Sequence, residues 1–248
     1  MAWVETTSAR FSARHDDREA ADAAQVLRTL DGVVDRFEDA LGTPAGDLTL
    51  VLHGNEAQLD AAAPTVPVLR RMTHPAGRRY VVGWAGEDEL HVLSPRALAR
   101  RATNAEGSLE LLMLTPVSLL ARNLLASALP GMPPPWTARA WPRYLRWAWL
   151  LEGAAQWMSG GVPHVRPVVA RRLREGPEPA FPPARADALL LGGTLFDLVT
   201  REDGPDAALE LALTAPQRGA RAAIERAFDG RDLRHTEAAW RSFVARDR

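Results

Sequence analysis

Glu152 is the side chain of this sequence with the plainest capacity for chemistry, and it lies in segment 149–155, W-L-L-E-G-A-A. At 3.6 residues per turn it shares a helical stripe with Leu145 and Ala148, which puts a single carboxylate on an apolar face. An unpaired buried carboxylate is costly, so Glu152 needs a cation, a metal ion or a proton. The functional interpretation is a metal ligand or its remnant. The structural interpretation is a glutamate that reaches solvent or pairs with an arginine.

Histidines are the other residues able to bind a metal ion or act as a base, and the sequence contains six. They are well separated along the chain; His91 lies within a predicted strand and His164 follows the Glu152 helix. A site built from His164, Glu152 and His91 requires the cleft to bring them together. Gln156, one turn beyond Glu152, is a further candidate cleft residue. Without such convergence these are ordinary surface or partly buried histidines.

Neither a serine nucleophile nor a phosphate loop is indicated. Ser118 is not in a G-x-S-x-G elbow and has no neighbouring base. Gly192 and Gly193 lack the strand, glycine-rich turn and helix of a phosphate loop. We therefore expect these two glycines to allow close packing of their helix.

Composition excludes several classes of site. The 248 residues include no cysteine, which removes disulfides, thiolate zinc sites, iron–sulfur clusters and cysteine nucleophiles. All 30 basic residues are arginine, yet the formal net charge is only −1 and the arginines are scattered in pairs. Because nucleic-acid binding needs a concentrated basic stripe, we expect no nucleic-acid partner.

No membrane segment is expected either. The N-terminus lacks a basic segment followed by an apolar run, so no secretory signal is predicted. The apolar stretch 109–129 approaches the length of a membrane span, but Pro116, Arg122 and Asn123 interrupt it. We therefore expect a soluble, cytoplasmic protein.

The pattern of elements predicts an α+β fold, with a small mixed β-sheet in the N-terminal part packed on a largely helical C-terminal part. Predicted strands are 8–15, 47–53, 79–84 and 89–94, with helices at 18–41 and 55–63 and a polar loop at 70–79. Further predicted helices are 95–102, 107–129, 140–160, 166–175, 186–203, 205–213, 216–228 and 235–246. We expect a strand-containing lobe, 1–105, and a helical lobe, 106–248, in one compact unit with a cleft between them.

The order of these parts resembles the peptidase MA-like domains, which are zinc peptidases of the gluzincin type. The strands at 82–85 and 90–95 are similar to the strand pair that ends in the substrate-facing edge strand of that family. Segment 149–155 resembles its W-x-x-E-G-x-A segment, whose glutamate is the third zinc ligand. The resemblance covers nearly the whole chain in short, degenerate pieces. It implies a zincin-like fold in which Glu152 is a vestigial third-ligand position.

The central helix departs from the family pattern, which has H-E-x-x-H: two zinc-binding histidines one turn apart and a glutamate that activates water. Pro116 and Leu120 stand where the histidines belong, and Val117 stands where the glutamate belongs. A register shifted by one residue gives Thr115, Leu119 and Pro116 instead. No H-E-x-x-H occurs elsewhere in the chain.

A catalytic zinc ion needs three protein ligands and an open position, and Glu152 offers one. The resemblance therefore implies a pseudopeptidase, a non-catalytic scaffold without a metal cofactor that binds or regulates an unknown protein or peptide. The alternative is an active metallopeptidase, or another hydrolase, with displaced ligands that uses Glu152 in the cleft. Zinc would be the cofactor of that metallopeptidase.

Two further expectations concern the surroundings of Glu152. Arg122 lies about one turn beyond the lost ligand positions and is expected to neutralise Glu152 where a metal ion once did. Tryptophans crowd the Glu152 helix and the segment before it, and they either pack in the core or form a protein-binding surface. These tryptophans are Trp136, Trp141, Trp147, Trp149 and Trp157.

Overall fold

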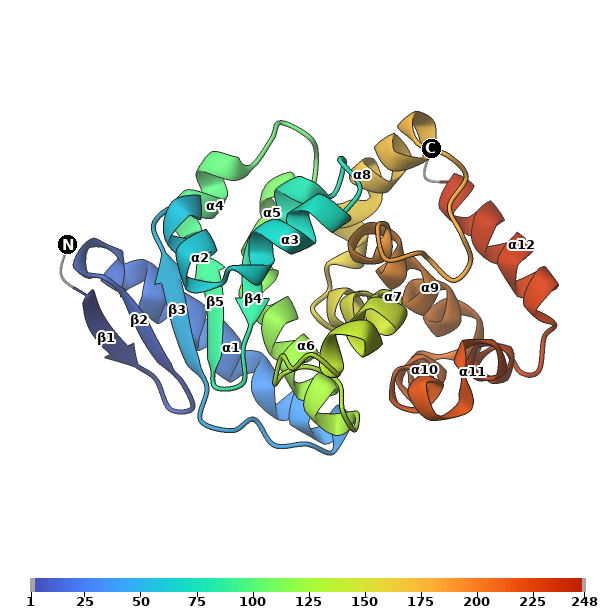
Figure 1. Ribbon diagram of the computed structural model, residues 1–248, viewed down its shortest axis with the longest axis horizontal. Coiled ribbons are helices and arrows are strands. Elements are labelled where there is room, and N and C mark those ends of the chain that lie inside the picture. Colours follow the sequence, from blue (N-terminus) through green and yellow to red (C-terminus); the bar gives the residue numbers. More distant parts are fainter. Residues whose placement is uncertain (1–2, 247–248) are drawn as a thin grey trace.

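A mixed β-sheet of five strands forms the N-terminal part of the computed structural model, which describes residues 3–246 (Figure 1). The strands are β1 (Trp3–Thr7), β2 (Ser12–Asp16), β3 (Thr49–His53), β4 (Gly83–Ala85) and β5 (Glu89–Leu93), in the order β1-β2-β3-β5-β4. The three central strands are parallel, and each edge strand runs antiparallel to its neighbour. The predicted α+β class with a mixed N-terminal sheet is confirmed.

Helices pack on the sheet and then form the rest of the molecule. α1 (Ala20–Leu41) passes behind the sheet in Figure 1 and packs against α6 (Thr115–Ala128), while α2 (Glu56–Ala62) contacts β3 and β5. The remaining helices are α3 (Thr65–Met72), α4 (Pro95–Arg101), α5 (Ser108–Met113), α7 (Ala140–Met158), α8 (Val162–Glu175), α9 (Ala188–Asp203), α10 (Pro205–Arg218), α11 (Ala220–Ala227) and α12 (Leu233–Ala245). Two short 3₁₀ turns complete the chain, η1 (Asp17–Glu19) and η2 (Arg78–Tyr80).

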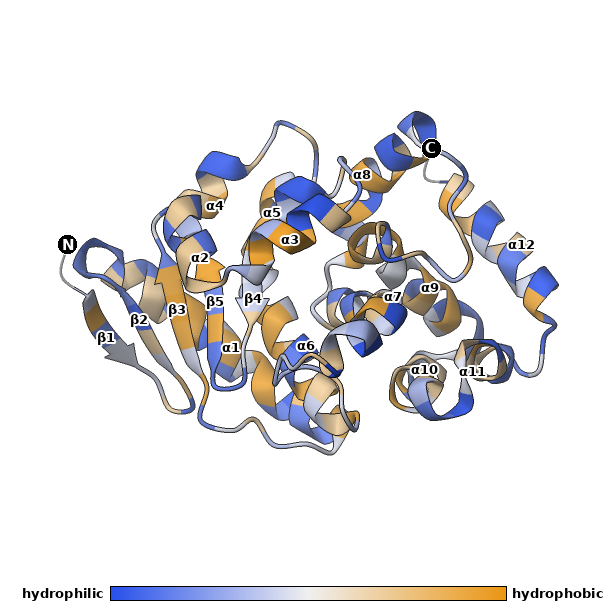
Figure 2. Ribbon diagram, in the orientation of Figure 1, coloured by the Kyte–Doolittle hydropathy of each residue, from blue (hydrophilic) through white to orange (hydrophobic). Residues whose placement is uncertain are grey.

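One continuous apolar core runs from the sheet into the C-terminal helices. Leu50 and Leu52 are buried in β3, whose central residues are hydrophobic (Figure 2). Leu120 of α6 and Leu150 of α7 belong to the same core, so the predicted lobes 1–105 and 106–248 share it. Within residues 3–246, no helix combines the length and the apolar character needed to cross a bilayer.

The helix predicted at 107–129 is wrong as a single element, because it is divided at Leu114 into α5 and α6. Pro116 lies in the first turn of α6. Proline has no backbone N–H and its ring clashes with the preceding turn, so a continuous helix is interrupted on its N-terminal side. The division sets the rotation of α6 independently of α5.

Other elements differ from the prediction in their limits. β1 was not predicted; it has no buried residue and therefore no alternating apolar pattern. α3 includes the start of the predicted loop 70–79, and α8 begins at Val162 rather than at 166. α10 continues through Pro216 to Arg218 and is followed by Gly219, whose φ of +86° favours glycine.

Two glycines fix how α7 lies on α9. A Cβ atom on Gly153 would lie 2.4 Å from the carbonyl carbon of Gly192, and one on Gly192 would lie 2.6 Å from the backbone oxygen of Trp149. The two backbones are therefore in direct contact, and the predicted role of Gly192 in close packing is confirmed. Because Gly153 follows Glu152, this crossing also determines which way the carboxylate points.

Candidate functional site

The Glu152 side chain lines a cavity of about 100 Å³ between the edge of the sheet and the helical part of the chain. β4 and the residues before it form one wall, α6 forms a second and α7 forms a third. Arg185 and the first turn of α9 close the remaining side. This cavity, called the Glu152 cavity, lies where the cleft was predicted. Most of its lining is apolar and includes Leu69, Leu111, Leu114, Leu119, Leu145 and Leu189.

Glu152 has two partners in the cavity. Its Oε1 accepts a 2.9 Å hydrogen bond from the Tyr144 hydroxyl and lies 3.4 Å from Nε of Arg122. The Glu152 side chain is 15% exposed and the Arg122 side chain only 3%, so water screens this ion pair little. The predicted pairing of Arg122 with Glu152 is therefore present.

Tyr144 acts as the donor in this group because its proton is held firmly. Burial raises the pKa of the Tyr144 phenol well above its ordinary value of 10.0, and the negative charge of Glu152 raises it further. Tyr144, Ala148 and Glu152 follow one another at intervals of one helical turn. That spacing was the available sequence signal for Tyr144, which the sequence analysis missed.

Three aromatic rings surround the Arg122 guanidinium. Its central carbon lies 5.4 Å from the Trp84 ring centroid, 5.2 Å from that of Trp136 and 5.4 Å from that of Tyr144. These distances are typical of cation–π contacts, which strengthen when the cation is removed from water. Nε and Nη2 of Arg122 are both buried and form no hydrogen bond within residues 3–246, so the contact with Glu152 is an ion pair and not a hydrogen bond. The aromatic rings and Glu152 thus hold a charge that water does not reach.

Trp136 closes this group from the segment before α7. Its indole stacks on Trp84 with centroids 3.9 Å apart, and its Nε1 donates a 2.9 Å hydrogen bond to the backbone oxygen of Ala85. Trp147 and Trp149, in contrast, are buried in the core. The tryptophan cluster therefore divides between core packing and the cover over Arg122. Neither Trp84 nor Trp136 was predicted as a site residue, since only the tertiary structure brings them to α6.

The three residues predicted to stand at the lost H-E-x-x-H positions do not face Glu152. Pro116, Val117 and Leu120 do not line the Glu152 cavity; Val117 and Leu120 lie in the core on the opposite side of α6. The stripe of α6 that faces Glu152 consists of Thr115, Ser118, Leu119 and Arg122. Ser118 and Arg122 of this stripe stand one turn apart, and Leu119 lies between them. The division at Leu114 sets the rotation of α6, and the periodicity of a longer helix does not reveal that division.

The structure does not bring His164 and His91 to Glu152, because no histidine lines the Glu152 cavity. His91 instead places Nδ1 3.1 Å from Nε2 of His53 and Nε2 3.1 Å from Glu89. His164 lies in the first turn of α8, with its backbone against Gly107. Among residues 3–246, no three histidine, aspartate or glutamate side chains lie close enough together to hold a metal ion. Glu152 is the only residue of these three types among the described residues that line its cavity.

Gln156 does line the cavity, as predicted. Its Nε2 donates a 3.0 Å hydrogen bond to the backbone oxygen of Leu189, and its Oε1 is buried without a donor in the described part of the chain. A Cβ atom on Gly193 would lie 2.2 Å from that Oε1. Gln156 thus joins α7 to the start of α9 at the floor of the cavity.

Chemically, the cavity combines apolar walls with charges that neutralise one another. The carboxylate of Glu152 is shared by a phenol and a guanidinium, so the group suits binding better than proton transfer. No family model and no curated protein matches the sequence, and no solved structure matches the fold. The comparisons therefore assign the chain to no family.

Proposed function

We propose that this protein is a non-catalytic peptide-binding protein on a gluzincin-like scaffold, in which Arg122 takes the place of a metal ion beside Glu152. The observation that carries the proposal is the 3.4 Å contact between Arg122 Nε and Glu152 Oε1. A permanently charged guanidinium neutralises the carboxylate without offering a Lewis acid or an activated water. With Ser118 and Arg122 taken as the counterparts of the two histidines, Leu119 stands at the place of the general base and can neither accept nor donate a proton.

The arrangement of elements supports the gluzincin-like part of the proposal. The antiparallel edge strand β4 lies along α6, and the helix carrying Glu152 packs on α6 from the other direction. This is the order of parts that the resemblance implies for a zinc peptidase. A scaffold persists after its chemistry is lost, because packing needs only apolar side chains at the former ligand positions.

The proposed ligand is a peptide because β4 has backbone groups at its outer edge that an extended peptide can pair with. Gly83 pairs with Val92 of β5, and the bond from Leu93 N to Val82 O shows that the neighbouring pair is hydrogen-bonded. Since hydrogen-bonded and non-bonded pairs alternate in antiparallel sheets, the N–H and C=O of Gly83 point away from β5. Gly83 lines the Glu152 cavity, so one residue of an extended peptide can pair with it and place an apolar side chain inside.

Binding of apolar peptides tests the proposal, with Ser118→Phe and Ser127→Phe as matched variants. Ser118 lines the cavity, whereas Ser127 is exposed on the same helix and does not line it. We expect short apolar peptides to bind the wild type and the Ser127→Phe variant, and Ser118→Phe to abolish binding by filling the cavity. Isothermal titration calorimetry measures the affinity, and circular dichroism checks that both variants are folded.

The rival hydrolase function is tested on the same preparations. Peptide cleavage with added Zn²⁺ is measured for the wild type and for Glu152→Gln, and we expect no turnover in either. Turnover that disappears in a folded Glu152→Gln variant would establish the hydrolase instead. Failure of the wild type to bind any member of a peptide library would remove the peptide-binding function.

A further inference from the structure

Four arginines line a second hollow, which lies outside the Glu152 cavity and has a volume of about 580 Å³. It is formed by the start of α2, by η2 and by α4. The arginines come from two pairs that are distant in sequence, Arg78-Arg79 and Arg100-Arg101. This hollow is called the arginine groove. The scattered pairs noted in the sequence therefore form a concentrated basic site after folding.

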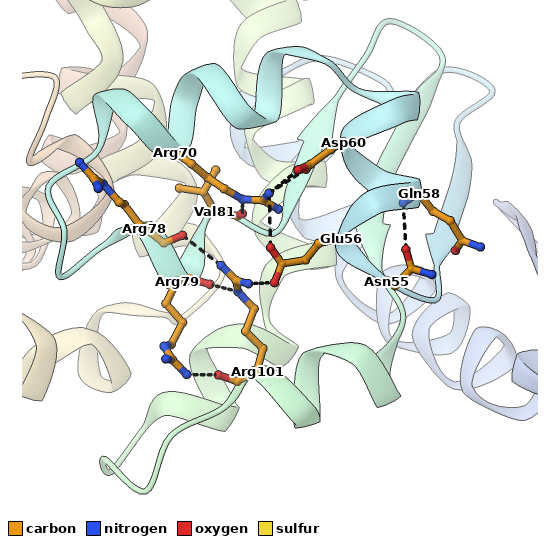
Figure 3. Close-up of polar contacts among 9 residues, drawn as sticks. All are labelled: Asn55, Glu56, Gln58, Asp60, Arg70, Arg78, Arg79, Val81 and Arg101. Carbon is orange, nitrogen blue, oxygen red and sulfur yellow. Dashed lines mark hydrogen bonds and ion pairs between the residues drawn. The ribbon is translucent and has the colours of Figure 1, made fainter.

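Arg101 holds the two sides of the arginine groove together (Figure 3). Its Nε donates to the backbone oxygen of Arg79 at 2.5 Å, and its Nη1 pairs with Glu56. Arg79 returns the contact, since its Nη1 donates to the backbone oxygen of Arg101 at 2.7 Å. The Arg101 side chain is only 17% exposed. It therefore fixes the geometry of the groove from beneath.

The carboxylates nearby are already engaged. Glu56 pairs with Arg101 and lies 3.5 Å from Nη1 of Arg70, and Asp60 lies 2.7 Å from the same nitrogen (Figure 3). These two acids balance the charges of Arg70 and Arg101. The local positive charge that remains comes from the other three arginines of the groove.

Arg78, Arg79 and Arg100 are held by backbone oxygens alone. Their guanidinium groups donate to Thr73 O at 3.1 Å, Arg101 O at 2.7 Å and Gly54 O at 3.0 Å, respectively. Within residues 3–246, none of the three forms an ion pair with a carboxylate. A carbonyl orients a guanidinium without neutralising it, so the groove presents three ordered and uncompensated positive charges.

This accumulation of charge has an effect on Arg101. Burial lowers the pKa of its guanidinium, and the charges of Arg70 and Arg79 act in the same direction, against Glu56. Like charges held close together repel, and a bound dianion removes that repulsion. Guanidinium groups match phosphate oxygens in both charge and geometry.

We propose that the arginine groove binds the phosphate groups of a small phosphorylated molecule, with Arg78, Arg79 and Arg100 as direct contacts and Arg101 as a positioning residue. A groove of about 580 Å³ suits a small molecule rather than a polymer. Its other lining residues include Pro75, Leu93 and Ala97 and no aromatic ring on which a base stacks. Recognition is thus of the phosphate and not of a base. The proposal is independent of the Glu152 cavity.

The experiment uses inorganic pyrophosphate and inorganic phosphate as probes in calorimetric titrations of the full chain at low ionic strength. We expect pyrophosphate to bind at one site, and Arg100→Gln and Arg79→Gln each to weaken binding roughly ten- to hundredfold by removing a charge-assisted contact. Arg234→Gln is the matched control, because it removes the same charge from an exposed position on α12 and should leave the affinity unchanged. Arg100 and Arg79 are exposed, so both variants should fold, and their thermal unfolding midpoints verify this.

Three outcomes overturn the proposal. The first is no binding of either probe by the wild type. The second is equal weakening by Arg100→Gln and Arg234→Gln, which indicates attraction to total charge only. The third is tighter binding of a tetraglutamate peptide or of a short single-stranded oligonucleotide than of pyrophosphate, which assigns the groove to a macromolecule.

Discussion

Tyr144 and Glu152, eight residues apart on α7, are joined by a 2.9 Å hydrogen bond that crosses a break in the helical geometry at Trp147 (φ −111°, ψ 15°). The phenol and the Arg122 guanidinium meet on the same carboxylate oxygen. Sequence periodicity places Glu152 alone on an apolar stripe. In the structure its carboxylate has one partner on its own helix and one on the neighbouring helix. The energetics of this trio can be measured directly.

Tyr144→Phe should lower the free energy of unfolding by about 2 kcal/mol at pH 8, because it removes a hydrogen bond to a charged group. The loss should depend on pH. The pKa of Tyr144 is raised above 10.0 in the folded state, so its contribution is present below pH 10 and is lost as the pH rises further. The difference in unfolding free energy between the wild type and Tyr144→Phe, measured by urea denaturation, should therefore become smaller above pH 10. A difference that stays constant up to pH 11 would contradict the role of the Tyr144 hydroxyl as a protonated donor to Glu152.

Arg122→Met should cost about 3 kcal/mol of unfolding free energy, since it leaves Glu152 without its cation in a poorly solvated site. Adding Glu152→Gln to the same chain should recover part of the loss, because the unpaired charge is removed. Chemical denaturation of the two single variants and the double variant completes a double-mutant cycle. Additive effects would show that the ion pair contributes nothing.

His53 should destabilise the protein as the pH falls. Burial, together with a smaller contribution from the charge of the neighbouring His91, lowers the pKa of His53 from 6.5 to about 4. A neutral imidazole in the folded state gives stability that is complete above pH 6.5 and is lost as the pH falls toward 4, on the order of 3 kcal/mol. His53→Gln should flatten this part of the stability curve. Nuclear magnetic resonance titration of the His53 ring should give a midpoint near 4; a midpoint near 6.5 would refute the prediction.

Gly153→Ala should destabilise the protein by about 3 kcal/mol, because the added methyl group meets the backbone of Gly192 and forces α7 away from α9. Gly32→Ala is the matched control. Gly32 is exposed within α1, and a Cβ atom there meets nothing within 4 Å, so alanine should stabilise the helix by about 0.5–1 kcal/mol. Thermal unfolding of the two variants should thus shift in opposite directions. Equal shifts of the unfolding midpoint would show that the backbones of α7 and α9 are not in direct contact.

Part of this structure follows from local sequence alone. The α+β class and α1, which ends at Gly42 with φ +62°, follow from apolar spacing and helix-end chemistry. The need of Glu152 for a cation, and the choice of Arg122, follow from the cost of an unpaired charge on an apolar face. The first of these properties depends on residues that are neighbours along one element, and the second depends on the charge of a single side chain.

Only the tertiary structure decided the rest. The rotation of α6 exposes Ser118 and Arg122 to the cavity instead of Pro116 and Leu120, because the break at Leu114 and the packing on α1 select one face. The aromatic cover over Arg122 and the arginine groove each combine segments that are distant along the chain. Periodicity describes which side of an element is apolar, but it carries no information on which elements meet. The contacts around Arg122 and in the arginine groove are of that second kind.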